Sequence, residues 1–112
     1  MKVETQPHGH ITVVVPHGPL VSDELDDLRR SLTSSATAKA KRIIFDLADV
    51  PYLDSGGIEL LLELCGPDVL PHQRPKIAAL SETCREALEL TNSQRRLEVF
   101  DTVENALRSC QR

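Results

Sequence analysis

The fold is decided by one stretch of the sequence, RIIFDLADVPYLDSGGIELLLELC, which occupies residues 42–65. Its first part, Arg42 to Leu47, sets apolar and β-branched side chains between polar neighbours, which is typical of a buried strand at the centre of a sheet. After a short turn, apolar residues recur at the helical spacing i, i+3, i+4, i+7, beginning at Ile58 and stopping before Gly66. The stretch therefore predicts a central strand, a turn, and a helix that starts near Ser55.

The same alternation of strand and helix extends to both sides of this stretch. Apolar or β-branched runs between turn residues predict further strands at 2–6, 10–15, 76–80 and 97–100, the first two joined as a hairpin through 7–9. Helical spacing predicts helices that begin at three capping residues, Ser22, Ser81 and Asp101, with a Ser/Thr/Ala-rich connector over 33–40. Strands that alternate with helices indicate an α/β layer structure with a mixed sheet.

Composition bounds the class of protein. The 112 residues are a single-domain length, with 13 Lys and Arg against 17 Asp and Glu, a formal charge of −4 and only 3% aromatic residues. The absence of a basic stripe and of stacking aromatics argues against a nucleic-acid partner. Apolar runs are short, such as Val13 to Val15 and Ile77 to Leu80, far below the roughly 20 residues that span a bilayer, so we expect a cytoplasmic protein without direct membrane insertion.

The sequence offers little for catalysis or for a cofactor. A nucleophile elbow at Ser55 fails because Leu53 stands where the G-x-S-x-G pattern needs glycine. His8, His10 and His17 lie beside turns with no acidic or cysteine partner in register, which favours solvated histidines over a metal site. No phosphate-binding glycine loop is present. The three cysteines are widely spaced and are expected as buried thiols. We therefore expect a protein that is not an enzyme, with no catalytic residue, no cofactor and no metal.

Two structural roles are possible for Ser55. It stands at the predicted start of an apolar helix, after Asp54 and before two glycines. One interpretation is a helix cap, which would contribute about 1 kcal/mol. The other is a phosphoacceptor, since the free N–H groups and the positive end of the helix dipole favour a phosphate. The two roles are compatible. Asp54 is expected to shape the turn and to contact a partner.

Residues 42–58 resemble the signature of the STAS domain of anti-sigma factor antagonists, in which a hydrophobic strand ending in Asp-Leu leads to an Asp-Ser-Ser/Thr-Gly-Leu turn and a helix. The strands and helices expected after residue 76 are similar to the end of that domain, so the resemblance covers roughly residues 10 to 110. It implies a single STAS domain over residues 1–112. The implied fold is a mixed sheet of four to five strands with helices mainly on one face.

The resemblance also implies a function. In that family the serine directly after the Asp, here Ser55, is phosphorylated by an anti-sigma factor that is also a serine kinase; a serine phosphatase is a possible further partner. The unphosphorylated domain binds the anti-sigma factor and so frees a sigma factor. Two turns expected at one end of the sheet supply the partner-binding residues. These are Leu20, Val21, Ser22, Asp54, Ser55, Gly56, Gly57 and Ile58.

The sequence departs from the family pattern in two places, and other functions stay open. Gly56 replaces a second hydroxyl residue, and the turn over residues 18–21 lacks the two acidic residues that the pattern has there. One alternative is a STAS subunit that docks on an ABC-type transporter or on another signalling complex. The other is a sensor of a small ligand or nucleotide.

Overall fold

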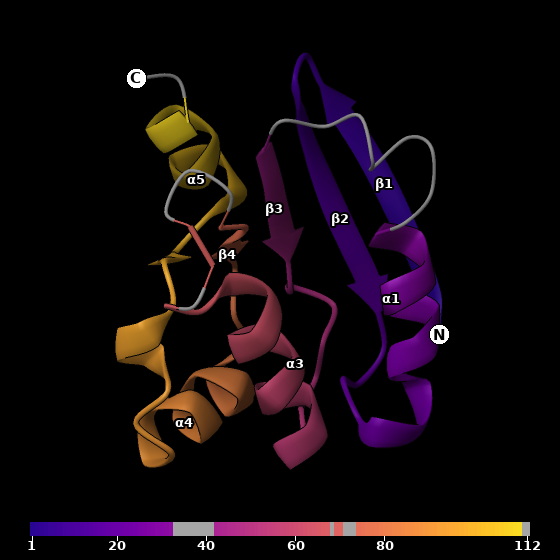
Figure 1. Cartoon of the computed structure of the whole chain (residues 1–112), viewed down its shortest axis with the longest axis vertical. Helices are drawn as coiled ribbons and strands as arrows, with labels where there is room; N and C mark the ends of the chain where they lie inside the picture. Colours follow the sequence, from indigo (N-terminus) through magenta and orange to yellow (C-terminus); the bar gives the residue numbers. More distant parts are fainter. Residues whose placement is uncertain (33–41, 68, 71–73, 111–112) are drawn as a thin grey trace.

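The structure is a computed structural model, and it describes residues 1–32, 42–67, 69–70 and 74–110. The connector expected over 33–40 and part of the loop before residue 76 lie outside these ranges. The described residues form one sheet with helices on both sides (Figure 1).

The sheet has five strands in the order β1-β2-β3-β4-β5. They are β1 (Lys2–His8), β2 (Ile11–His17), β3 (Arg42–Asp46), β4 (Lys76–Ala78) and β5 (Val99–Phe100). β1 and β2 form an antiparallel hairpin, and every later pair is parallel. The predicted mixed sheet, its hairpin and the central place of β3 are confirmed. Because β2 to β5 run in the same direction, their carboxyl ends meet at one edge of the sheet.

The helices follow the predicted order. They are α1 (Leu25–Leu32), α3 (Ser55–Cys65), α4 (Glu82–Leu90) and α5 (Val103–Cys110), with short 3-10 turns η1 (Ser22–Glu24) and η3 (Gln94–Arg96). In the described ranges, none of them has the length and apolar character that a membrane crossing needs. One of the two caps expected here is present and the other is not. Ser81 caps α4, as predicted, through the N–H of Cys84 at 3.2 Å. Asp101 does not cap α5, because the Thr102 hydroxyl accepts the N–H of Asn105 instead.

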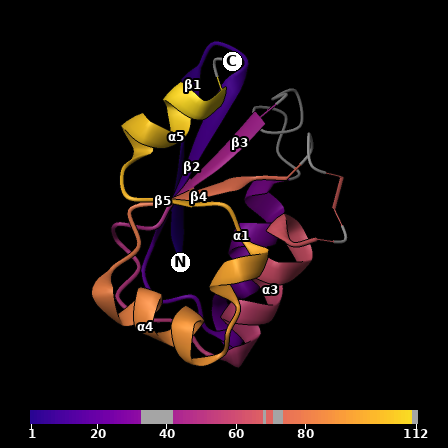
Figure 2. The same cartoon turned by 90° about the vertical axis from the view of Figure 1, so that its left-hand side faces the viewer.

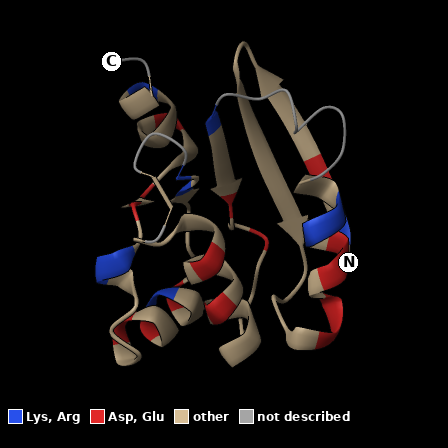
Figure 3. Cartoon of the chain, in the orientation of Figure 1, with Lys and Arg blue, Asp and Glu red and all other residues tan. Residues whose placement is uncertain are grey.

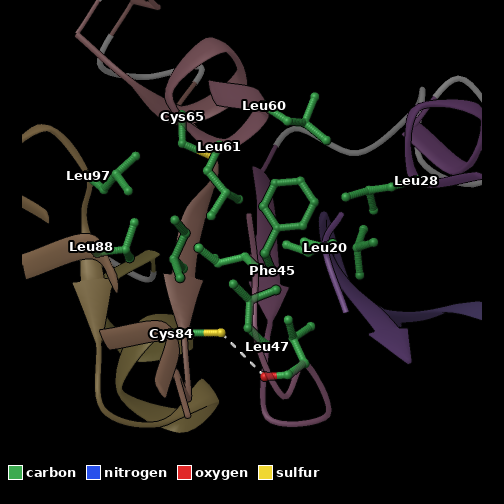
Figure 4. Packing of buried hydrophobic residues seen from close by; sticks show 14 of the residues in the cluster. Leu20, Leu28, Phe45, Leu47, Leu60, Leu61, Cys65, Cys84, Leu88 and Leu97 are labelled. Atoms are coloured by element: carbon green, nitrogen blue, oxygen red, sulfur yellow. Dashed lines mark hydrogen bonds between the residues drawn. The ribbon is translucent and has the colours of Figure 1, made fainter. Parts of the chain in front are cut away.

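The core consists of two clusters, one on each face of the sheet. Successive residues of a strand point to opposite faces, so Val14 and Phe45 lie in one cluster while Val13 and Ile44 lie in the other. The larger cluster packs under α1, α3 and α4, and ten of its residues are labelled in Figure 4. The smaller cluster packs under α5, on the opposite side of the strands (Figure 2). Helices thus lie mainly on one face, with α5 as the exception.

The three cysteines are free and buried. Cys65 and Cys84 belong to the larger cluster and Cys110 to the smaller one. Burial raises the pKa of the Cys65 thiol to about 12 and also raises the pKa of Cys84. These thiols therefore behave as small apolar side chains, as expected from their spacing.

Candidate partner-binding site

Two turns meet at the carboxyl ends of β2 and β3. A parallel bridge joins Leu20 to Leu53. The N–H of Leu20 donates to the carbonyl of Tyr52, and the N–H of Asp54 donates to the carbonyl of Leu20, both at 3.1 Å. These bonds hold the turn over residues 18–22 against the turn that leads into α3. The two segments named from the sequence therefore lie side by side.

The Asp54 carboxylate ties the two turns together. Its Oδ1 accepts the N–H of Gly57 at 2.9 Å, which makes Asp54 the N-cap of α3. Its Oδ2 accepts from Ser22 twice, from the N–H at 3.1 Å and from the hydroxyl at 3.2 Å. The backbone N–H of Gly57 and then that of Ser22 hold the pKa of the Asp54 carboxyl below its ordinary value. Asp54 is therefore the charged centre of this surface.

Ser55 does not cap α3, contrary to one of the two interpretations. Asp54 takes the cap position because its side chain reaches the third residue of the helix, which leaves Ser55 as the first helical residue. Ser55 is exposed, and within the described part of the chain its hydroxyl has no hydrogen-bond partner. Ser22 is not a cap either. Val21 precedes η1, and the Ser22 side chain turns to Asp54 instead.

The two glycines are places where chain segments approach closely. A Cβ placed on Gly57 would lie 2.2 Å from the carbonyl oxygen of Leu20, so any side chain there would collide with backbone. A Cβ on Gly56 would lie 2.2 Å from the Ser22 hydroxyl oxygen. The start of α3 is therefore packed against the turn before α1, with the Leu20 backbone as the obstacle at Gly57 and the Ser22 side chain as the obstacle at Gly56.

The eight predicted partner-binding residues divide by exposure. Leu20 and Gly57 are buried, so they support the surface from below and do not present side chains to a partner. Ser22 and Ser55 are exposed, and the others are partly exposed. Tyr52, three residues before Ser55 and 50% exposed, was not among the predicted residues. An aromatic residue in the turn between the central strand and the next helix was the signal available for it. Figure 3 shows acidic residues along α1 and α3, with basic residues of α1 among them.

His8 lies at the hairpin end of β1, away from this surface, whereas His17 ends β2 directly before the turn over residues 18–22. The expectation that the histidines lack acidic partners is wrong for His17, because strand pairing and the loop after β3 bring two carboxylates to its ring. Its Nδ1 contacts Asp49, and its Nε2 lies 3.3 Å from Glu4 Oε1. Across the described ranges, no group of three His, Cys, Asp or Glu side chains is arranged to hold a metal ion.

The comparison with protein families agrees with this geometry. The family model described as the STAS domain matches residues 2–106. The chain belongs to the STAS domain family. That match includes both turns of the candidate surface.

Solved structures with the same fold include anti-sigma factor antagonists and a sulfate transporter family protein. An anti-sigma factor antagonist from Mycobacterium paratuberculosis superposes on this STAS domain with a TM-score of 0.81 and 18% identity, covering 99% of this chain and 94% of the other. The unphosphorylated anti-sigma factor antagonist SpoIIAA of Bacillus gives 0.72 and 15%, covering 98% and 96%. A sulfate transporter family protein from Wolinella succinogenes gives 0.69 and 20%, covering 93% and 87%. At these identities the likeness shows the fold.

Proposed function

We propose that this STAS domain is an anti-sigma factor antagonist that binds an anti-sigma factor with serine kinase activity, frees a sigma factor for transcription, and is switched by phosphorylation of Ser55. The observation that carries the proposal is the Ser55 hydroxyl, exposed and unbonded within the described residues, directly after a carboxylate that fixes the turn. The Bacillus protein of the same fold has been solved in a phosphorylated form, which supports the proposal. A serine phosphatase would reverse the switch. The domain acts by binding and not by catalysis.

A phosphate on Ser55 would act mainly through its charge. It adds roughly −1.5 to −2 charges at neutral pH. The sequence alone suggests that N–H groups of the helix start would neutralise it, but Asp54 already accepts the N–H of Gly57. The phosphate therefore stands beside a carboxylate whose lowered pKa keeps it charged. A partner packed against this surface would have to desolvate both groups, and a loss of about 4 kcal/mol weakens binding roughly a thousandfold.

The test is calorimetric titration of three variants with the anti-sigma factor. Ser55→Ala should keep the affinity and escape phosphorylation, whereas Ser55→Asp and Ser55→Glu should keep the fold and lose affinity. Asn105→Asp is the control, because Asn105 is exposed at the start of α5 on the opposite face of the sheet. It adds the same charge away from the surface. Equal affinity for all variants, or tighter binding by the acidic ones, would contradict the proposed switch.

The surface itself is tested by amide chemical shifts. On addition of the partner, the shifts should cluster over residues 18–22 and 52–58. Shifts that cluster near Arg108 instead would place the partner on α5 and contradict the proposal.

Docking on a transporter is the second candidate, favoured by the structural likeness to the transporter-family protein. It predicts that a membrane transport protein, and not an anti-sigma factor, is recovered in a pull-down with the intact domain. The Ser55 variants separate the two candidates, since a phosphorylation switch by a kinase partner belongs to the first.

A further inference from the structure

The Ser22 hydroxyl occupies the space in which a side chain of residue 56 would begin. A Cβ built on Gly56 comes 2.2 Å from Ser22 Oγ and 3.2 Å from Ser22 Cβ, and also 3.2 Å from Asp54 Oδ1. The first of these distances is shorter than Cβ atoms show in proteins. The same hydroxyl lies 3.2 Å from Asp54 Oδ2. The missing side chain at position 56 therefore makes the room in which Ser22 reaches Asp54.

The two oxygens of Asp54 have separate tasks. Oδ1 caps α3 through Gly57, and Oδ2 receives the Ser22 N–H and hydroxyl from the turn before α1. Loss of the hydroxyl would leave Oδ2 with one donor of the two. Ser55 follows Asp54 directly. The orientation of the Asp54 carboxylate therefore determines how close its negative charge lies to a phosphate on Ser55.

We propose that Ser22 is a positioning residue of the site, which fixes the Asp54 carboxylate beside Ser55, and that Gly56 is the residue this arrangement requires. The site therefore has two hydroxyl groups, that of Ser55 and that of Ser22 in the turn before α1. The effect of Ser22 on partner binding rests on the proposed function. The pairing of Ser22 with Gly56 does not depend on it.

The neighbouring glycine provides the contrast. At Gly56 the obstacle is the end of a side chain, so a methyl group can be accommodated if the Ser22 hydroxyl rotates away from Asp54. At Gly57 the obstacle is the Leu20 carbonyl, which is held in place by the N–H of Asp54 at 3.1 Å. Gly56→Ala should therefore act by breaking the bond between Ser22 and Asp54. Gly57→Ala should act by displacing the backbone, whatever residue 22 is.

The experiment is a double-mutant cycle with Ser22→Ala, Gly56→Ala and the double variant, read by urea unfolding. If Gly56→Ala acts through Ser22, it costs less in the Ser22→Ala background, and the folding equilibrium constants should be non-additive by about fivefold. The helix preference of Ala over Gly is common to both backgrounds and cancels. The matched cycle of Ser22→Ala with Gly57→Ala should show a smaller non-additivity, because only the shared Asp54 carboxylate couples these two positions. Additivity in the Gly56 cycle would overturn the pairing.

A second measurement reports the positioning role directly. NMR titration of the Asp54 carboxyl in the intact domain should show its pKa rise in Ser22→Ala, rise in Gly56→Ala, and rise no further in the double variant. Ser22→Thr, which keeps the hydroxyl, should retain the low value. An unchanged pKa in Ser22→Ala would overturn the proposal. If the wild-type domain binds no anti-sigma factor, the proposed function fails, while these two measurements still decide the role of Ser22.

Discussion

The Ser81 hydroxyl has two structural roles that one substitution removes together. Its oxygen accepts the N–H of Cys84 at 3.2 Å as the cap of α4, and its O–H donates to the carbonyl of Val50 at 3.1 Å. Val50 is fully buried. Its carbonyl also receives the Cys84 thiol at 3.4 Å, a weak donor, drawn as the dashed line in Figure 4. Ser81 therefore joins α4 to the loop that leads from β3 to the Ser55 turn.

Replacing Ser81 by alanine should lower the free energy of unfolding by about 2 kcal/mol. Loss of a cap costs about 1 kcal/mol, and a carbonyl left with a weak donor costs about 1 kcal/mol more. The matched control is Thr102→Ala. The Thr102 hydroxyl caps α5 through the N–H of Asn105 at 3.1 Å and is exposed, so its loss should cost about 1 kcal/mol.

Urea unfolding of the two variants measures the difference, provided that both retain the wild-type m value. Ser81→Thr keeps the hydroxyl and should retain most of the stability. A loss in Ser81→Ala no larger than in Thr102→Ala would refute the contribution of the bond to Val50.

Three further predictions concern acid stability, thiol reactivity and the partner surface. Because the folded state lowers the pKa of Asp54 from 3.8, its contribution to stability is present above that value and is lost as the pH falls through the folded value. Asp54→Asn should therefore lose less stability than wild type in thermal melts between about pH 5 and pH 2, while it weakens partner binding at neutral pH. Cys65 should react with a thiol reagent only as fast as the domain unfolds, measured by mass spectrometry at increasing urea concentration; fast labelling in the folded state would contradict its burial. Tyr52→Ala should weaken partner binding at least tenfold in calorimetry, as exposed aromatic anchors do, whereas Leu90→Ala, 88% exposed at the end of α4, should not change it.

The sequence predicted the order of strands and helices because their patterns are strong. Residues 42–47 are apolar enough to be buried on both faces, and burial of Ile44 and Phe45 in different clusters confirms this. The hairpin was indicated by turn residues at 7–9, but the turn itself lies at residues 9–10, because Pro7 and His8 pair with β2 as part of β1. Both signals are local, and the tertiary structure agrees with them.

The caps were harder, because neighbouring polar residues compete for one position. Asp54 and Ser55 both have a suitable oxygen, and the choice depends on where α3 begins. That point is set by Gly57, which fits against the Leu20 carbonyl from another part of the chain. Thr102, and not the predicted Asp101, caps α5. The Asp101 Oδ1 lies 3.4 Å from an Arg85 guanidinium nitrogen instead. Local sequence does not contain these contacts.

The contacts inside the site depend on distance in three dimensions as well. The bonds from Ser22 to Asp54 join residues 32 positions apart, and the contact of His17 with Asp49 spans the same separation. The strand order predicts that the two turns lie at one end of the sheet, since parallel strands end there. It does not predict which donor bonds to which acceptor.

The two core clusters have no residue in common, and α5 is the helix that covers the smaller one. Detachment of α5 would expose Ile44, Ala78 and its own Ala106 while leaving the packing beneath α3 intact. Hydrogen exchange should therefore show two units that open separately. The amides of α5 should exchange with a lower free energy of opening than the amides of α3. The candidate partner-binding surface lies on the α3 side of the sheet, so we expect its shape to persist when α5 detaches and uncovers the opposite face.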